Sequence, residues 1–372
     1  ALINALMVLG GAFVLYRLAP LYDAAPLTSG VMTWVGLVTA VIAGLAASVQ
    51  SDIKRLMGYL ASSQMGVVFV GLGYGLDDIA GAQIVIYAVL QVLLMLCVGA
   101  VTRAMGDSRD MALYGGLRAK LPAAGFALTV TAVISSAFGV GLVGSGVLAP
   151  VAGNALFQSS FASNPLAFYT LCAATAIGVF AVWRLVLLTM AGPSRAPDDV
   201  FAAVEPSPRV MSLAIGLLCL AMLGAVVWLV PLIIAGEQDL AVAGWVSLVP
   251  LIMAGLGFLL AMWVYVFQPG LPKSLMTSFG ALHALLKTGF YMDLLFDIAL
   301  KKPVKRIGET LGQTADARLF DAGPAWFGAA LDPGYGRIAR QRFGWAVIAL
   351  GVIVAFGLLA VTTWIILNRS GV

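Results

Sequence analysis

Charged side chains are scarce in this chain of 372 residues. Asp, Glu, Lys and Arg make up 10% of the sequence, against about 25% in a typical soluble domain. Hydrophobic residues make up 61%, and the mean hydropathy is +1.01. The composition excludes an ordinary soluble fold, and we expect an all-α integral membrane protein whose helices occupy most of the length.

Histidine and cysteine are also scarce. The one histidine of the sequence, His283, lies in a polar stretch, where a surface position is commoner than a metal ligand. The three cysteines, Cys97, Cys172 and Cys219, lie far apart within apolar segments. Their spacing is typical of neither a metal site nor a disulfide pair, so we expect small core residues and no metal.

The first residues lack both an initiator Met and a charged segment ahead of the apolar run. They are ALINALMVLG, which differs from the pattern of a secretory signal peptide. We therefore expect the chain to begin within a longer protein, as the product of a split gene or as a truncated sequence.

The most informative apolar segment spans residues 79–102, which is long enough to cross a bilayer and holds no charge. Its polar side chains Gln83, Tyr87 and Gln91 are four residues apart and are expected on one helix face. Because polar groups are costly against lipid, this face should point into a helix bundle. The spacing fits either hydrogen bonds between helices or the remnant of an ion path, and by itself it favours hydrogen bonds.

Composition divides the chain into three parts. Residues 1–267 hold eight apolar segments and predict a transmembrane bundle. Residues 268–343 hold ten of the 21 Lys and Arg residues and predict a lateral segment, and residues 344–372 predict a final transmembrane anchor. In the lateral segment, YMDLLFDIALKKPVKRIGETLG has the pattern of an amphipathic helix with Asp293 and Asp297 on its polar side, which favours a position along the membrane interface.

Basic residues are unevenly distributed among the predicted loops. With nine crossings, nearly all Lys and Arg residues fall on one side of the membrane, which should face the cytoplasm or the mitochondrial matrix. The C-terminus is then on the opposite side. In the loop sequence SDIKR, Asp52 suits the positive end of a helix dipole, whereas Lys54 and Arg55 suit the interface.

A glycine-rich stretch interrupts the apolar segment at 121–151. AFGVGLVGSG, residues 137–146, predicts that regular helical hydrogen bonding fails between Phe138 and Ala149. Such a break fits an ion site or close helix packing equally well. Its glycines are Gly139, Gly141, Gly144 and Gly146. Further along, Arg184 lies near the end of the predicted helix at 166–190, and we expect it to snorkel or to find a partner inside the bundle.

Three motifs carry a family resemblance. SDIKRLMGYLASSQMG is close to TDIKRVLAYSTxSQxG, YMDLLFDIALKKP is close to Y-x-D-x-L-Y-D, and AVWRLVLLTMAG is close to Y-x-x-R-x-x-x-x-x-F-x-G. The chain thereby resembles the distal antiporter-like subunit of respiratory complex I, subunit L in bacteria and the fifth mitochondrially encoded subunit in mitochondria. The resemblance covers the C-terminal part of that family, about helices eight to sixteen.

The resemblance also shows where this chain departs from the family. The family's relay histidines correspond to Asn4, Gln83 and Tyr87 here. Its relay lysines correspond to Gln91 and Ser145. None of these side chains titrates near neutral pH. They can bind water but cannot store a proton, so we expect a structural role for this part and no catalytic residue.

The resemblance implies a membrane-arm subunit of a proton-translocating NADH:quinone oxidoreductase in a mitochondrial inner or bacterial cytoplasmic membrane. NADH, FMN, iron–sulfur clusters and quinone are then expected in other subunits. The expected partners are neighbouring antiporter-like subunits, a missing N-terminal half or separate chain, and lipids. Two alternatives stay open: a subunit of a cation/proton antiporter, and a membrane scaffold without transport.

Overall fold

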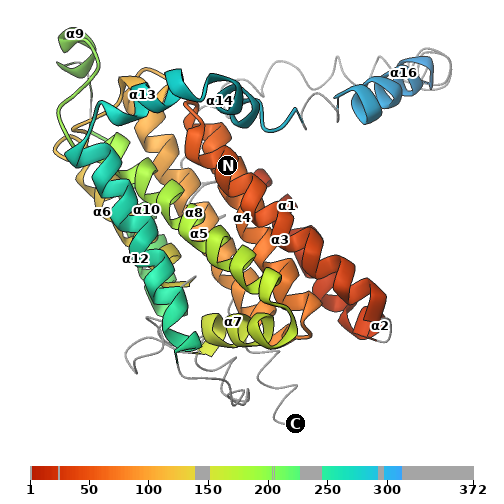
Figure 1. Ribbon diagram of the computed structural model, residues 1–372. Coiled ribbons are helices and arrows are strands. Elements are labelled where there is room, and N and C mark those ends of the chain that lie inside the picture. The colour runs from red at the N-terminus through yellow and green to blue at the C-terminus, as the bar shows by residue number, and fades with distance from the viewer. Residues whose placement is uncertain are drawn as a thin grey trace. The chain divides into compact units, whose positions relative to one another are not determined.

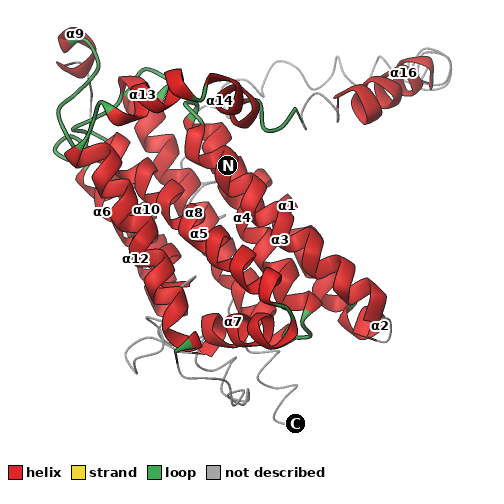
Figure 2. Cartoon of the chain, in the orientation of Figure 1, coloured by secondary structure: helices red, strands yellow, loops and turns green. Residues whose placement is uncertain are grey.

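The computed structural model describes residues 2–23, 26–138, 151–202, 204, 206–226, 245–291 and 297–311. Within these ranges the secondary structure is helical apart from one isolated bridge between Asp52 and Asp110 (Figure 2). Five of the described helices are long and apolar enough to cross a membrane. The chain is therefore an all-α membrane protein, as its composition predicts.

The five candidate spans are apolar along most of their length. They are α3 (Pro26–Val49), α4 (Ile53–Gly73), α5 (Asp77–Ala104), α8 (Pro165–Met190) and α12 (Val249–Met262), the last of which continues through η5 (Trp263–Phe267). The shorter helices of the bundle are α1 (Leu2–Arg17), α2 (Ala19–Asp23), α6 (Pro122–Phe138), α7 (Val151–Ser163) and α10 (Arg209–Gly224). The connecting elements are η1 (Met111–Leu113), α9 (Asp198–Ala202), η4 (Val246–Leu248), α13 (Leu271–Ser278) and α14 (Gly280–Lys287).

Helix α7 is an element that the sequence analysis did not assign. Only its first residue, Val151, fell within a predicted helix. The segment is short, and its run of Gln158, Ser159 and Ser160 hides the apolar pattern. It is held by packing, because Phe157 and Phe161 meet Phe168 edge to face with ring centroids 6.2 and 5.3 Å apart.

The chain divides into two compact units, Ala1–His283 and Ala284–Val372. In the first unit, α8 packs against α3, α12, α6 and α7, while α5 packs against α4, α1, α6 and α10 (Figure 1). In the second unit, the structure describes η6 (Asp297–Lys301) and α16 (Lys302–Leu311). These two elements cover much of the predicted amphipathic helix. Its position relative to the bundle, including the side of the membrane on which it lies, stays a prediction.

Three loops meet at one end of the first unit. The Ile53 amide donates to the Arg109 carbonyl at 3.0 Å, and the Met111 amide donates to the Ser51 carbonyl at 2.9 Å. The Asp52 carboxylate accepts hydrogen bonds from the backbone amides of Lys54 and Arg55 and thereby caps the N-terminus of α4. These contacts bring together the loops that follow α3 and α5.

The loop that follows α8 joins the same end. Arg195 donates from Nε to the Tyr114 carbonyl at 2.6 Å, and the Gly116 amide donates to the Ala191 carbonyl at 3.3 Å. Burial, together with the nearby carboxylates of Asp52 and Asp110, raises the pKa of the Tyr114 phenol, which stays neutral. We call this end of the unit the basic end. Its Lys and Arg residues are Lys54, Arg55, Arg103, Arg109, Arg118, Lys120 and Arg195.

Helices α3 and α4 approach each other most closely at glycines. A Cβ atom added at Gly66 would lie 2.6 Å from the Gly36 carbonyl oxygen and 2.7 Å from the Ala40 amide nitrogen. Beside this contact, the Ser63 hydroxyl donates to the Ala40 carbonyl at 2.8 Å. Small residues let helix backbones touch in lipid, where dispersion and interhelical hydrogen bonds replace the hydrophobic effect. The contact therefore sets the distance between the two helices.

We predict that Gly66→Ala destabilises the protein by about 1–3 kcal/mol, because the new methyl group meets backbone atoms that cannot move aside. Gly58→Ala is the matched control on the same helix, since a Cβ there has no neighbour within 4 Å. The control should be neutral or slightly stabilising, because Ala favours a helix over Gly. Thermal unfolding in detergent measures both variants. Equal melting temperatures would contradict this close approach.

Candidate functional site: a buried polar cavity

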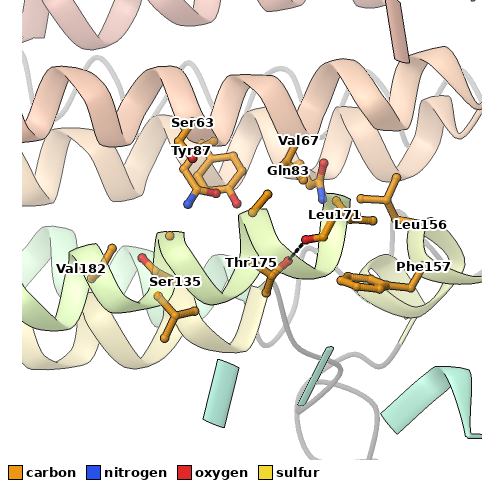
Figure 3. Close-up of a pocket in the computed structure, with 14 residues that line it drawn as sticks. Ser63, Val67, Gln83, Tyr87, Ser135, Leu156, Phe157, Leu171, Thr175 and Val182 are labelled. Atoms are coloured by element: carbon orange, nitrogen blue, oxygen red, sulfur yellow. Dashed lines mark hydrogen bonds between the residues drawn. The ribbon is translucent and has the colours of Figure 1, made fainter. Parts of the chain in front are cut away.

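A small, mostly enclosed cavity lies among α4, α5, α6, α7 and α8 in the first unit (Figure 3). Its volume is about 30 Å³, which is enough for about two water molecules. No Lys, Arg, His, Asp or Glu is found among the described residues that line it. Its polar lining residues are Ser63, Gln64, Gln83, Tyr87, Ser135 and Thr175.

Gln83 places a buried amide oxygen without a hydrogen-bond donor among the described residues beside the cavity. Its side chain is 1% exposed, and its Oε1 atom has no hydrogen-bond partner among the described residues. A buried polar atom left unsatisfied costs about 1–3 kcal/mol. A molecule that donates a hydrogen bond in the cavity removes this cost, and water fits both the volume and the chemistry.

Two hydroxyl groups beside the cavity are oriented by hydrogen bonds to backbone carbonyls. Thr175 donates to the Leu171 carbonyl at 2.9 Å, and Ser63 donates to Ala40 of α3. The hydroxyl protons of Thr175 and Ser63 are thus engaged with backbone, which leaves their oxygen lone pairs as acceptors. Together with Gln83 Oε1, they favour a guest that donates hydrogen bonds.

The three polar residues of α5 do not all reach this cavity. Gln83, Tyr87 and Gln91 are buried, as the sequence analysis expected, with exposures of 1%, 5% and 9%. Only Gln83 and Tyr87 line the cavity. A step of four residues advances about 40° around a helix with 3.6 residues per turn. Over eight residues the face turns by about 80°, which carries Gln91 away from the cavity.

Arg184 lies inside the bundle and is 5% exposed. Its Nε donates to the Tyr265 hydroxyl at 2.9 Å, and its Nη1 donates to the Ala47 carbonyl at 3.4 Å. The guanidinium carbon is 5.9 Å from the centre of the Tyr265 ring, within range of a cation–π interaction. A buried charge needs such partners. Arg184 thereby links α8 to α3 and η5 without a carboxylate among its described partners.

The other residues singled out from the sequence lie in several places. Lys54 and Arg55 are exposed at the basic end. Asp297 pairs with Lys301 at 3.0 Å on the exposed surface of η6. Asn4 lies in α1, but its side chain is outside the described part. Also outside it are Asp293, Ser145 and the four glycines of the predicted break, Gly139, Gly141, Gly144 and Gly146.

Sequence reasoning missed part of the cavity lining. Ser63 and Gln64 lie within the SDIKRLMGYLASSQMG motif, but the motif was used only as a family signature. Thr175 is flanked by apolar residues, and Ser135 is one of two adjacent serines in an apolar helix. Both patterns also fit hydrogen bonds to the preceding turn. A search for polar residues central to several predicted spans would have found all four, although only the fold shows that they share a cavity.

Comparisons with known proteins find a family match that includes most of the cavity-lining residues. The model of the family described as NADH:quinone oxidoreductase/Mrp antiporter, transmembrane, matches residues 1–178. This segment includes α4, α5, α6 and α7 and most of α8, and therefore nearly all of the cavity lining.

Several curated proteins are similar over longer ranges. The chain is 28% identical over 453 residues to NADH-quinone oxidoreductase subunit L of Rhodobacter capsulatus, with 100% of this chain and 63% of the relative covered. It is 26% identical over 386 residues to NADH-ubiquinone oxidoreductase chain 5 of Cryptococcus neoformans var. grubii, with coverage of 97% and 57%. It is 28% identical over 228 residues to F(420)H(2) dehydrogenase subunit L of Methanosarcina mazei, with coverage of 59% and 34%.

The chain thus spans about three fifths of the length of the first two relatives. The matches confirm the resemblance that the sequence motifs indicated. Residues 1–178, just under half of the chain, match the model of the NADH:quinone oxidoreductase/Mrp antiporter transmembrane family, and the chain as a whole is similar to proteins named subunit L and chain 5.

Proposed function

We propose that this chain is a membrane-arm subunit of a proton-translocating NADH:quinone oxidoreductase and that this part of the subunit is structural. The family match and the relatives named subunit L and chain 5 support the first half of the proposal. The second half depends on one observation. The buried polar cavity is lined by amides, hydroxyls and apolar groups, with no side chain among its described lining that carries charge at neutral pH.

A proton relay needs a buried group whose charge changes in response to its neighbours. Lys, His and carboxylates do this through pKa shifts of several units. The Gln83 amide and the hydroxyls of Ser63 and Thr175 have no such charge change near neutral pH. The cavity can therefore bind water and pass on hydrogen bonds, but its lining does not store a proton.

The remaining parts of the complex follow from the proposed membership. NADH oxidation and quinone reduction, with FMN and iron–sulfur clusters, take place in other subunits. This chain contacts neighbouring antiporter-like subunits and lipids. Its amphipathic segment, described over η6 and α16, clamps the neighbours together. The complex lies in a mitochondrial inner or bacterial cytoplasmic membrane, and the C-terminus of this chain is on the outer side.

A cation/proton antiporter subunit is a second candidate. The description of the matching family includes the Mrp antiporter, which favours it. The uncharged cavity lining counts against it, because cation exchange also needs a site that changes its protonation. Sodium-driven proton movement in vesicles without NADH would identify this function. If the same vesicles show neither sodium-driven nor NADH-driven proton movement, the chain is a scaffold without transport.

We predict that Gln83→Leu, Gln91→Ala and Ser145→Ala leave the number of protons moved per NADH unchanged, because none of these side chains titrates near neutral pH. The measurement uses the assembled complex in sealed vesicles, with NADH oxidation and proton uptake recorded together. Ala61→Ser on α4 is the control, because Ala61 does not line the cavity. It shows whether any substitution in the bundle changes the measured proton yield. A lower proton yield at normal assembly would show that this part of the chain conducts protons.

We also predict that deletion of residues 290–372 lowers the amount of assembled complex several-fold, because the clamp and the predicted anchor are removed together. Native gel electrophoresis of solubilised membranes measures this amount. Asp297→Asn is the matched control. It removes only an exposed ion pair with Lys301, which contributes about 1 kcal/mol or less. Normal assembly of the deletion variant would rule out the clamp.

A further inference from the structure

A long apolar groove lies between α6 and α10 on the surface of the first unit. Its volume is about 830 Å³. Its walls include the exposed side chains of Phe126 on α6 and Leu213, Leu217 and Leu220 on α10, each 62–67% exposed. Gly216 lies between the leucines, and a Cβ added there has no neighbour within 4 Å. The groove therefore offers an apolar guest a continuous surface with free space.

The polar residues of the groove cluster at its start on α10. Ser207, Arg209 and Ser212 all precede the leucine-rich part of the helix. From Arg209 to Leu223 the helix rises about 21 Å. One leaflet of a bilayer has a hydrocarbon depth of about 15 Å. An acyl chain that begins beside Arg209 can therefore follow the groove through the whole leaflet.

Charge at this end favours a negative head group. Arg209 is exposed, and no Asp or Glu is found among the described residues that line the groove. Arg118 and Lys120 immediately precede α6, whose first turns form the facing wall, and the Arg118 stem lies beside Gly125 of that helix. A guanidinium binds phosphate through two parallel hydrogen bonds, and serine hydroxyls can add further ones.

We propose that the groove between α6 and α10 binds an anionic phospholipid, with its phosphate on Arg209 and one acyl chain along Leu213, Leu217 and Leu220. The proposal is independent of the function proposed above. A partner helix would also bury the leucines, but it would need an acidic group placed opposite Arg209. A phospholipid carries its phosphate next to the start of its acyl chains, which matches a groove whose polar residues precede its leucines.

The test compares lipid binding by the purified full chain in detergent, using native mass spectrometry with phosphatidylglycerol and phosphatidylcholine. The wild-type chain should retain phosphatidylglycerol in preference. Arg209→Gln should weaken phosphatidylglycerol binding about tenfold and abolish the preference, because a charge-assisted hydrogen bond is lost. Gly216→Leu should weaken the binding of both lipids by filling the groove.

Two matched controls separate this site from general effects. Lys54→Gln removes one exposed positive charge of the basic end that does not line the groove. Gly58→Leu adds the same side chain as the groove-filling variant at another glycine whose Cβ has no neighbour within 4 Å. Both should bind lipid as the wild-type chain does. Equal losses in Lys54→Gln and Arg209→Gln, or unchanged binding by Gly216→Leu, would overturn the proposal.

A photo-crosslinking residue at Leu217 tests the groove in the native membrane. Crosslinks to phospholipid would support the proposal, and crosslinks to a neighbouring protein in place of lipid would overturn it. Because this readout needs neither NADH oxidation nor proton uptake, it can fail or succeed whatever the outcome for the proposed function.

Discussion

Each polar group buried in this bundle must find a partner inside the protein, because lipid offers none. The close approach of α3 and α4 shows how the chain meets this constraint. Glycines let the backbones touch, and Ser63 then reaches the Ala40 carbonyl across the contact. Arg184 meets the same constraint with a phenol and a backbone carbonyl. The bundle is held by contacts of this kind and by close packing.

Gln83 is the exception that marks the cavity. Its amide oxygen is buried, yet no described protein group donates to it. The Thr175 hydroxyl donates to its own helix and the Ser63 hydroxyl donates to α3, so the oxygen atoms of both remain available as acceptors beside the cavity. The result is a neutral site suited to water. In the proposed structural role, this lining binds water but offers none of the charge changes that drive proton transfer.

The surface of the bundle combines cationic loops at one end with exposed apolar side chains along the helices. At the basic end, Asp52, Arg195 and the loops that follow α3, α5 and α8 are joined by hydrogen bonds to backbone groups. Arg209 begins α10 with an exposed cation and an apolar groove beyond it. Positive charge at the interface, followed by apolar surface across one leaflet, matches the chemistry of a phospholipid.

Much of the architecture could be predicted from the sequence, because lipid allows few backbone solutions to a long apolar segment. Length and composition alone identify α3, α4, α5 and α8 as helices, and the loop charges identify the residues of the basic end. The family resemblance also predicts the relay positions and predicts neutral residues at each of them. These inferences need only local pattern and residue chemistry.

The tertiary structure decided which polar residues share a cavity. Ser63, Gln83 and Thr175 come from three helices, and their proximity depends on how those helices cross. Because four residues exceed one helical turn by about 40°, Gln91 faces a different direction from Gln83, although their spacing suggested that both lie on one helix face. Helix α7 likewise depends on Phe157 and Phe161 packing against Phe168. Sequence by itself determined the helices and their chemistry, whereas the packing of side chains far apart in the chain determined the site.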